Sequence, residues 1–136
     1  MKILRNILAI IGGLLIGGIV NGGIIMISGS IIPPPAGADI TTTEGLKASM
    51  HLFTPINFLM PFLAHAIGTL VGAFIAAHIA ATKKMIFALI IGALFLVGGI
   101  MMVVEVPSPT WFSIIDIIGS YIPMAWVGWK LAGSKK

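Results

Sequence analysis

The sequence predicts an all-α integral membrane protein folded as a four-helix bundle, and three observations carry this prediction. Apolar residues make up 58% of the 136 residues. Charged residues make up only 9%, whereas a soluble domain carries about 25% and uses them to cover its surface in water. Four apolar stretches are each long enough to cross about 30 Å of hydrocarbon as a helix. These stretches are residues 7–27, 56–81, 85–104 and 111–131.

Composition also excludes several classes of protein. High hydropathy and low charge exclude intrinsic disorder, which needs the opposite balance. The absence of cysteine excludes disulfide scaffolds, thiolate zinc sites, iron–sulfur clusters and cysteine nucleophiles. The apolar stretches are too long for barrel strands, and a helix satisfies every backbone polar group within lipid. We therefore expect residues 1–136 to form a single helical membrane domain.

The first span, residues 7–27, is expected to be a retained helix. The segment before it and the apolar run itself resemble a secretory signal, and residues 28–30 resemble a cleavage site. However, the apolar core of a signal peptide has about 7 to 15 residues, and this run is longer. The retained helix is therefore favoured over a cleaved signal.

Small residues recur on the first and second spans and predict where these helices pack. In lipid, close approach of two backbones across small residues supplies the packing energy, so we expect the two spans to form the tightest seam. The alternative is that the glycines of the first span form a homodimer interface or a sliding joint. The expected packing residues are Gly13, Gly17, Gly18 and Gly22 on the first span and Ala64, Gly68, Gly72 and Ala76 on the second.

Residues 28–55 form the one substantial hydrophilic segment. Within it, Pro33–Pro35 predict a stiff polyproline stretch, and Thr41 and Glu44 have the spacing of a helix capping box. Apolar residues at near-helical spacing follow, which predicts a short amphipathic helix on the outer face of the membrane. We expect this helix to be a lid over the bundle. A gate or a partner-docking surface is the alternative.

Proline and tryptophan shape the second and fourth spans. Pro61 would kink the second span unless the helix begins near it. Pro123 lies within the fourth span, where a kink either frees a carbonyl for a ligand or only shapes the packing. Trp111 and Trp129 are separated by about 28 Å of helix, which is typical of aromatic anchors at the two membrane interfaces.

The distribution of basic residues predicts the orientation of the bundle. Seven of the eight precede the first span, join the second span to the third, or follow the fourth. By the positive-inside rule this side is cytoplasmic, so both termini are expected in the cytoplasm. The net charge of +4 is thus a topology signal, and nucleic-acid binding is not expected. The seven residues are Lys2, Arg5, Lys83, Lys84, Lys130, Lys135 and Lys136.

Asp116 and His65 are the ionisable residues placed well inside the spans, where such residues are costly and usually functional. A rise of about 1.5 Å per residue puts both in the outer third of the bundle, with Asn21 at a similar depth. Each shares a helix face with small residues, so each is expected to point inward. We therefore expect a cluster of Asn21, His65 and Asp116, in which the carboxylate favours a charged imidazole.

Three roles are open for this cluster. It is a hydrogen-bonded knot that fixes the register of the helices, a proton or cation relay, or a catalytic or metal site. The acidic and histidine residues of the outer side lack any metal-ligand spacing. We therefore predict no metal and no cofactor.

Four segments carry a resemblance to a known group of proteins. They are the glycine-rich first span ending in Asn21, the loop Ile32–Asp39, the run Leu63–Ala73 and the segment Pro107–Phe112. Together they resemble small bacterial membrane proteins with four spans, over most of the chain. The resemblance implies a four-helix fold in a bacterial inner membrane, and it implies no activity.

Function is expected to be non-enzymatic, because no nucleophile or set of metal ligands converges in the sequence. We expect a small polytopic inner-membrane protein that serves as a structural or accessory subunit in the lipid bilayer. A homodimer or a larger membrane complex would form through the glycine-rich face. The alternative is a proton- or cation-coupled carrier for a small solute, with Asp116 and His65 as the exchanging groups.

Overall fold

The computed structural model describes residues 1–133, which hold helices, turns and loops but no strand. Four helical segments in this part of the chain are long and apolar enough to cross a membrane. The prediction of an all-α fold with four apolar spans is confirmed. The helices that form them are α1 (Lys2–Ile31), α3 (Leu59–Ile79), α4 (Lys84–Glu105), and the pair α5 (Thr110–Gly119) and α6 (Ile122–Leu131).

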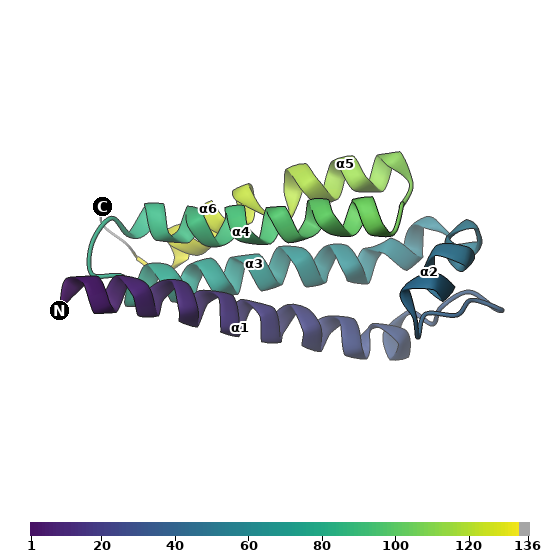
Figure 1. Cartoon of the computed structure of the whole chain (residues 1–136), viewed down its shortest axis with the longest axis horizontal. Helices are drawn as coiled ribbons and strands as arrows, with labels where there is room; N and C mark the ends of the chain where they lie inside the picture. Colours follow the sequence, from purple (N-terminus) through teal and green to yellow (C-terminus); the bar gives the residue numbers. More distant parts are fainter. Residues whose placement is uncertain (134–136) are drawn as a thin grey trace.

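The helices lie side by side along one axis (Figure 1). The start of α1, the turn from α3 to α4 and the end of α6 meet at one end of the bundle, which we call the basic end. The connection from α1 to α3 and the connection from α4 to α5 lie at the other end, which we call the loop end. Helix α3 packs against α1, α4 and α6 and is the centre of the bundle.

Helix α1 is longer than the predicted span of residues 7–27. It runs for 30 residues, from Lys2 to Ile31, because no glycine cap or proline interrupts the pattern at either predicted boundary. Ile32 then takes an extended conformation, with φ −126° and ψ 96°. Pro33 follows directly, and the ring of a proline excludes the helical conformation from the residue before it.

The second span begins with a short 3₁₀ turn, Pro55–Phe58, followed by α3. The side chain of Asn57 accepts a hydrogen bond from the backbone N–H of Thr54 at 2.8 Å and so closes this first turn. Pro61 is the third residue of α3, where a backbone N–H has no carbonyl to bond within the helix. The helix begins near Pro61, as the sequence allowed. Pro61 therefore does not disrupt the backbone hydrogen bonds of α3.

The fourth span is broken in two. Helix α5 ends at Gly119, Ser120 and Tyr121 form the break, and α6 begins at Ile122 with Pro123 in its first turn. Proline cannot donate to the carbonyl four residues earlier, and its ring collides with it. The helix therefore ends before Pro123 and starts again around it.

The connection at the loop end holds the short helix α2 (Thr43–Ser49), and a 3₁₀ turn (Met50–Leu52) follows it. The predicted cap is wrong by one residue, because the side chain of Thr42 accepts from the N–H of Gly45 at 2.9 Å. Thr41 instead donates its N–H and its hydroxyl to Asp39 Oδ1, at 2.9 and 2.6 Å. These bonds hold the pKa of the exposed Asp39 carboxyl below its usual value, the hydroxyl contributing most.

Helices α1 and α3 touch through their backbones. A Cβ added at Gly13 would lie 2.7 Å from the carbonyl oxygen of Gly72, and one added at Gly17 would lie 2.8 Å from that of Gly68. By contrast, a Cβ added at Gly18 or Gly22 would have no neighbour within 4 Å in the part of the chain that the structure describes, so these two glycines face outward from the bundle. The expectation that they pack within it is wrong, because the glycine doublets recur every five residues and drift around the helix.

The interior next to the basic end is built almost wholly of alanine. Its members come from all the long helices, and each is fully buried. Small side chains let four helices approach closely, which is how helices gain packing energy in lipid. This cluster consists of Ala9, Ala73, Ala76, Ala77, Ala80, Ala88, Ile91 and Ala125. Ala64 of α3 is also fully buried.

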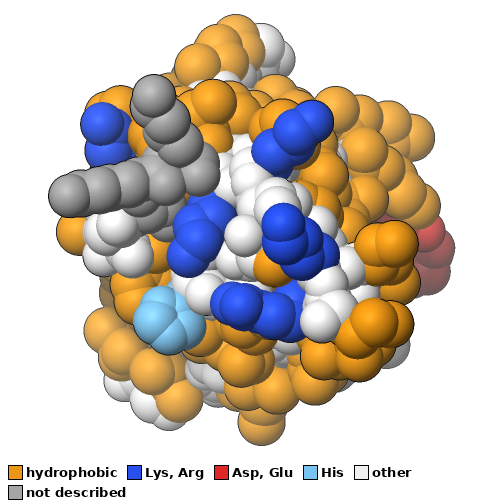
Figure 2. All heavy atoms as spheres, turned by 90° about the vertical axis from the view of Figure 1, so that its left-hand side faces the viewer, with side chains coloured by type: hydrophobic (Ala, Val, Ile, Leu, Met, Phe, Trp, Pro, Cys, Tyr) orange, Lys and Arg blue, Asp and Glu red, His pale blue; other side chains and the backbone are white. Residues whose placement is uncertain are grey.

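Lysine and arginine side chains gather at the basic end (Figure 2). Arg5 donates from Nε to the carbonyl oxygen of Ile79 at 3.1 Å, so it caps the end of α3. Asn6 accepts from the N–H of Ala81 at 2.9 Å and donates to Thr82. The turn that follows places Lys83 in the left-handed conformation, with φ 45°. Of the predicted basic residues, Lys135 and Lys136 lie outside the described part of the chain.

Candidate functional site

His65 on α3 and Asp116 on α5 form a close pair inside the bundle. His65 Nδ1 lies 2.8 Å from Asp116 Oδ1 and 2.9 Å from Oδ2, so one ring nitrogen faces both carboxylate oxygens. The side chain of Asp116 is 4% exposed and that of His65 is 22% exposed. Helical periodicity predicts that both side chains point inward at the same depth. In the structure the two side chains are in contact.

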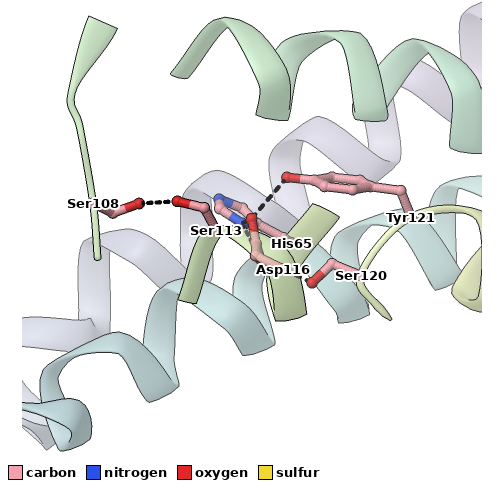
Figure 3. A network of polar contacts seen from close by, with 6 residues as sticks. All are labelled: His65, Ser108, Ser113, Asp116, Ser120 and Tyr121. Atoms are coloured by element: carbon pink, nitrogen blue, oxygen red, sulfur yellow. Dashed lines mark hydrogen bonds and ion pairs between the residues drawn. The ribbon is translucent and has the colours of Figure 1, made fainter. Parts of the chain in front are cut away.

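Two further hydroxyl groups complete the surroundings of Asp116 (Figure 3). Ser120, one turn further along, donates to Oδ1 at 2.9 Å. Tyr121 donates from its phenol to Oδ2 at 3.3 Å. Each oxygen of the buried carboxylate therefore has two donors, which meets the requirement that a buried charge be paired and hydrogen-bonded.

Tyr121 reaches this site because the fourth span is broken. On a continuous helix, a residue five positions after Asp116 would point about 140° away from it. Tyr121 instead has φ −113° and ψ −79° at the junction of α5 and α6. Its ring stacks on that of His65 with centroids 5.9 Å apart, and its phenol packs against Gly99 of α4, where any side chain would collide with it.

Two cavities meet at His65. The loop-end cavity, of about 280 Å³, is bordered by residues of the α1–α3 connection such as Met50 and Phe53, and it reaches Asp116. The middle cavity, of about 370 Å³, lies among α1, α3 and α4 and reaches Tyr121. Most of the surface of both cavities is apolar. The residues that border both are Ile25, His65, Gly99 and Met102.

Asn21 does not join the hydrogen bonds of the pair, although it was expected in the same cluster. Its side chain packs over Gly68 and borders the middle cavity, as does that of His65. Its Oδ1 atom is buried and has no hydrogen-bond partner among the residues that the structure describes. The structure thus brings the Asn21 side chain to the same cavity as His65 and leaves its buried Oδ1 unpaired among the described residues.

The other polar residues near the site are separate from it. Ser113, three residues before Asp116 on α5, pairs with Ser108, with 2.8 Å between the two hydroxyl oxygens. Within residues 1–133, no group of three or more histidine and acidic side chains is arranged to hold a metal ion. Asp116 also has no oxygen free of a donor, so the site is organised around protons and hydrogen bonds.

His65 is the group of the pair that is open to chemistry. Its Nδ1 is occupied by the carboxylate, which fixes the tautomer and leaves Nε2 as the second nitrogen. Among the described residues, no hydrogen bond to Nε2 is found, and the ring borders both cavities. A nitrogen in this position can accept a proton or bind a donor from the cavity. No protein-family model, no curated protein and no solved structure matches the chain, so its function is argued from this geometry.

Proposed function

We propose that this multi-pass membrane protein is a proton-coupled carrier for a small solute, with His65 and Asp116 as the proton-exchanging pair. One observation carries the proposal: a buried carboxylate orients an imidazole that borders two cavities. Ionisable side chains within a membrane are costly and mark ion and proton pathways. A purely structural hydrogen bond would need neither the cavities nor an open ring nitrogen.

The proposed orientation places the basic end in the cytoplasm of a bacterial inner membrane. Lys2, Arg5, Lys83, Lys84 and Lys130 lie at this end (Figure 2), whereas Asp39, Glu44 and Glu105 lie at the loop end. The excess of basic residues favours the cytoplasmic side. In this orientation the pair lies toward the outer face, and α2 with its neighbouring turn is a lid over the loop-end cavity.

The two ends of the bundle differ in packing, and this difference supports a carrier whose site is open to one side of the membrane at a time. The loop-end cavity runs from the α1–α3 connection to the pair. The alanine cluster fills the bundle on the other side, toward the basic end. Transport then requires α6 to move away from α3, and the break at Ser120 and Tyr121 is the point where the fourth span can bend.

Proton exchange is tested in liposomes that contain the purified protein and a pH-sensitive dye. We expect a pH gradient to drive proton movement that is lost in Asp116→Asn and in His65→Gln. Asp39→Asn is the matched control, because it removes a carboxylate outside the bundle. If the wild type and both site variants move protons equally, the carrier is excluded and the pair is a structural knot.

A second candidate, a structural or accessory subunit, is favoured by the outer surface of α1. Only Ala9, Gly13 and Gly17 of its 30 residues are buried, and Gly18 and Gly22 face outward with nothing near them. A partner helix can approach closely at such glycines. Disulfide formation in Gly18→Cys, compared with Ile16→Cys about 160° around the helix, tests for a homodimer through this face.

A further inference from the structure

The middle cavity is mostly apolar, and the few polar side chains that border it carry hydrogen-bond acceptors. Asn21 Oδ1 is a buried acceptor without a partner among the described residues. With Nδ1–H directed at the carboxylate, the Nε2 of a neutral His65 is also an acceptor. Tyr121 uses its proton on Asp116, which leaves lone pairs on the phenol oxygen. The side chains that carry these three acceptors border one cavity, so a ligand with several N–H donors suits it.

The charge next to the cavity favours a cation. Asp116 is the one acidic side chain within hydrogen-bond reach of His65 and Tyr121 in the described chain. Among residues 1–133, no lysine or arginine borders the middle cavity. A single negative charge in a low-dielectric interior attracts a cation far more strongly than it would in water. An anionic ligand is thereby excluded from this cavity.

The size and the walls of the cavity favour an organic cation. Its volume of about 370 Å³ lies within the range of about 300 to 1,000 Å³ that is typical of small-molecule sites. Phe95, Ile25 and Met102 provide an apolar wall against which an alkyl chain can pack. A bare inorganic ion would leave most of this space and this apolar surface unused.

We propose that the middle cavity binds a protonated primary amine with a short alkyl chain, in exchange for a proton on His65. The inference rests on the proposed carrier function and names its substrate class. The ammonium group donates its three N–H bonds to Asn21 Oδ1, His65 Nε2 and the phenol oxygen of Tyr121. Two positive charges would repel beside one carboxylate, so the imidazolium releases its proton to water when the amine binds.

The titratable groups that surround His65 permit this exchange. Asp116 on α5 and Tyr121 at the start of α6 face it. The neighbouring positions on α1 and α4 are Asn21, Ile25, Gly99 and Met102, none of which titrates. Proton release on binding is therefore assigned to His65.

The test is calorimetric titration of the detergent-purified protein with butylammonium in two buffers of different ionisation enthalpy, which counts the protons released. We expect saturable binding with release of up to one proton per amine. Tetramethylammonium lacks N–H donors and butan-1-ol lacks charge, so both should bind at least about tenfold more weakly, the cost of a lost hydrogen bond to a charged group.

Three variants locate the site. Asn21→Leu should weaken butylammonium binding by about tenfold through loss of one charged hydrogen bond, and Asn21→Asp should strengthen it. His65→Gln keeps an acceptor and should bind without proton release. Gly18→Ala, on the outward face of α1, is the matched control and should bind as the wild type does.

Equal binding of tetramethylammonium, or binding by Asn21→Leu and Asn21→Asp that matches the wild type, overturns the inference. Binding without proton release by the wild type overturns the exchange. Liposome transport separates this inference from the proposed function. Proton movement that depends on His65 but not on any amine overturns the inference and keeps the carrier. Amine binding with proton release but no transport overturns the carrier and keeps the binding site.

Discussion

The two halves of the bundle are packed by different means. Toward the basic end, the interior is a cluster of alanines, and α1 and α3 meet through their backbones at Gly13 and Gly72. Toward the loop end, the interior holds Asp116, His65 and Tyr121 with two cavities beside them. One half is filled by small, fully buried side chains, whereas the other combines cavities with a buried polar pair. Dense packing and buried polar groups therefore lie in opposite halves of the same four helices.

The largest loss of stability is expected when the pair of Asp116 and His65 is broken. Asp116→Leu leaves His65, Ser120 and Tyr121 without their acceptor, and removal of one partner of a buried pair costs about 3–5 kcal/mol. Replacement of both partners, His65→Leu with Asp116→Leu, should restore most of the loss because no charged or unpaired group remains. Unfolding in mixed detergent micelles measures both. A double variant as unstable as the single one would show that the pair is not energetically coupled.

A smaller loss is expected from breaking the seam. A Cβ at Gly72 would lie 2.7 Å from the carbonyl oxygen of Gly13, so Gly72→Val should separate α1 from α3 and cost about 1–3 kcal/mol. The matched control is Gly18→Val on the outward face of α1, which has no neighbour within 4 Å. Equal loss of thermal stability in the two variants would mean that the seam does not hold the helices together.

The basic end also contains a strained residue, whose removal should sharpen the comparison by stabilising the tightly packed half. Lys83 has φ 45°, a left-handed conformation that costs about 1 kcal/mol for a residue with a side chain. Lys83→Gly should therefore raise the free energy of unfolding by about this amount. Lys84→Gly, at the first position of α4, is the control and should not stabilise the protein.

The smallest loss of stability is expected when low pH protonates Asp39 at the loop end. The hydroxyl and the N–H of Thr41 lower the pKa of Asp39 from its ordinary value of 3.8. The stabilisation of the loop is therefore complete above pH 3.8 and is lost as the pH falls through the lower pKa of the folded state. Limited proteolysis by pepsin across this window should cleave the α1–α3 connection more readily at the lower pH. Thr41→Val should abolish the pH dependence.

The sequence was sufficient for the four spans and for the pairing of His65 with Asp116. Span lengths follow from the thickness of the hydrocarbon, and the facing of the pair follows from helical periodicity, both of which are local properties. The cap of α2 was misplaced by one residue because Thr41 and Thr42 are chemically alike. Only the position of Asp39, which takes both donors of Thr41, decides between them.

Periodicity failed where the chain departs from one regular helix. On a continuous helix the spacing of Tyr121 from Asp116 points its side chain away from the site, and the break before Pro123 reverses this. Pro123 itself was the signal of the break. The tight contacts of Gly92 and Gly128 with neighbouring helices were also missed, since they depend on how α6 crosses α3 and α4.

The broken fourth span has a consequence for the way the protein enters the membrane during synthesis. Its mean hydropathy is 1.3, against 1.9 to 2.8 for the other three, and it carries Asp116, a type of residue that raises the cost of insertion by the translocon. Helix α3 emerges from the ribosome first, so His65 is already in place when Asp116 arrives. The bundle is thus expected to assemble in the order of the chain. His65 on α3 then provides the polar partner that helps the weakly hydrophobic fourth span to insert into the bilayer.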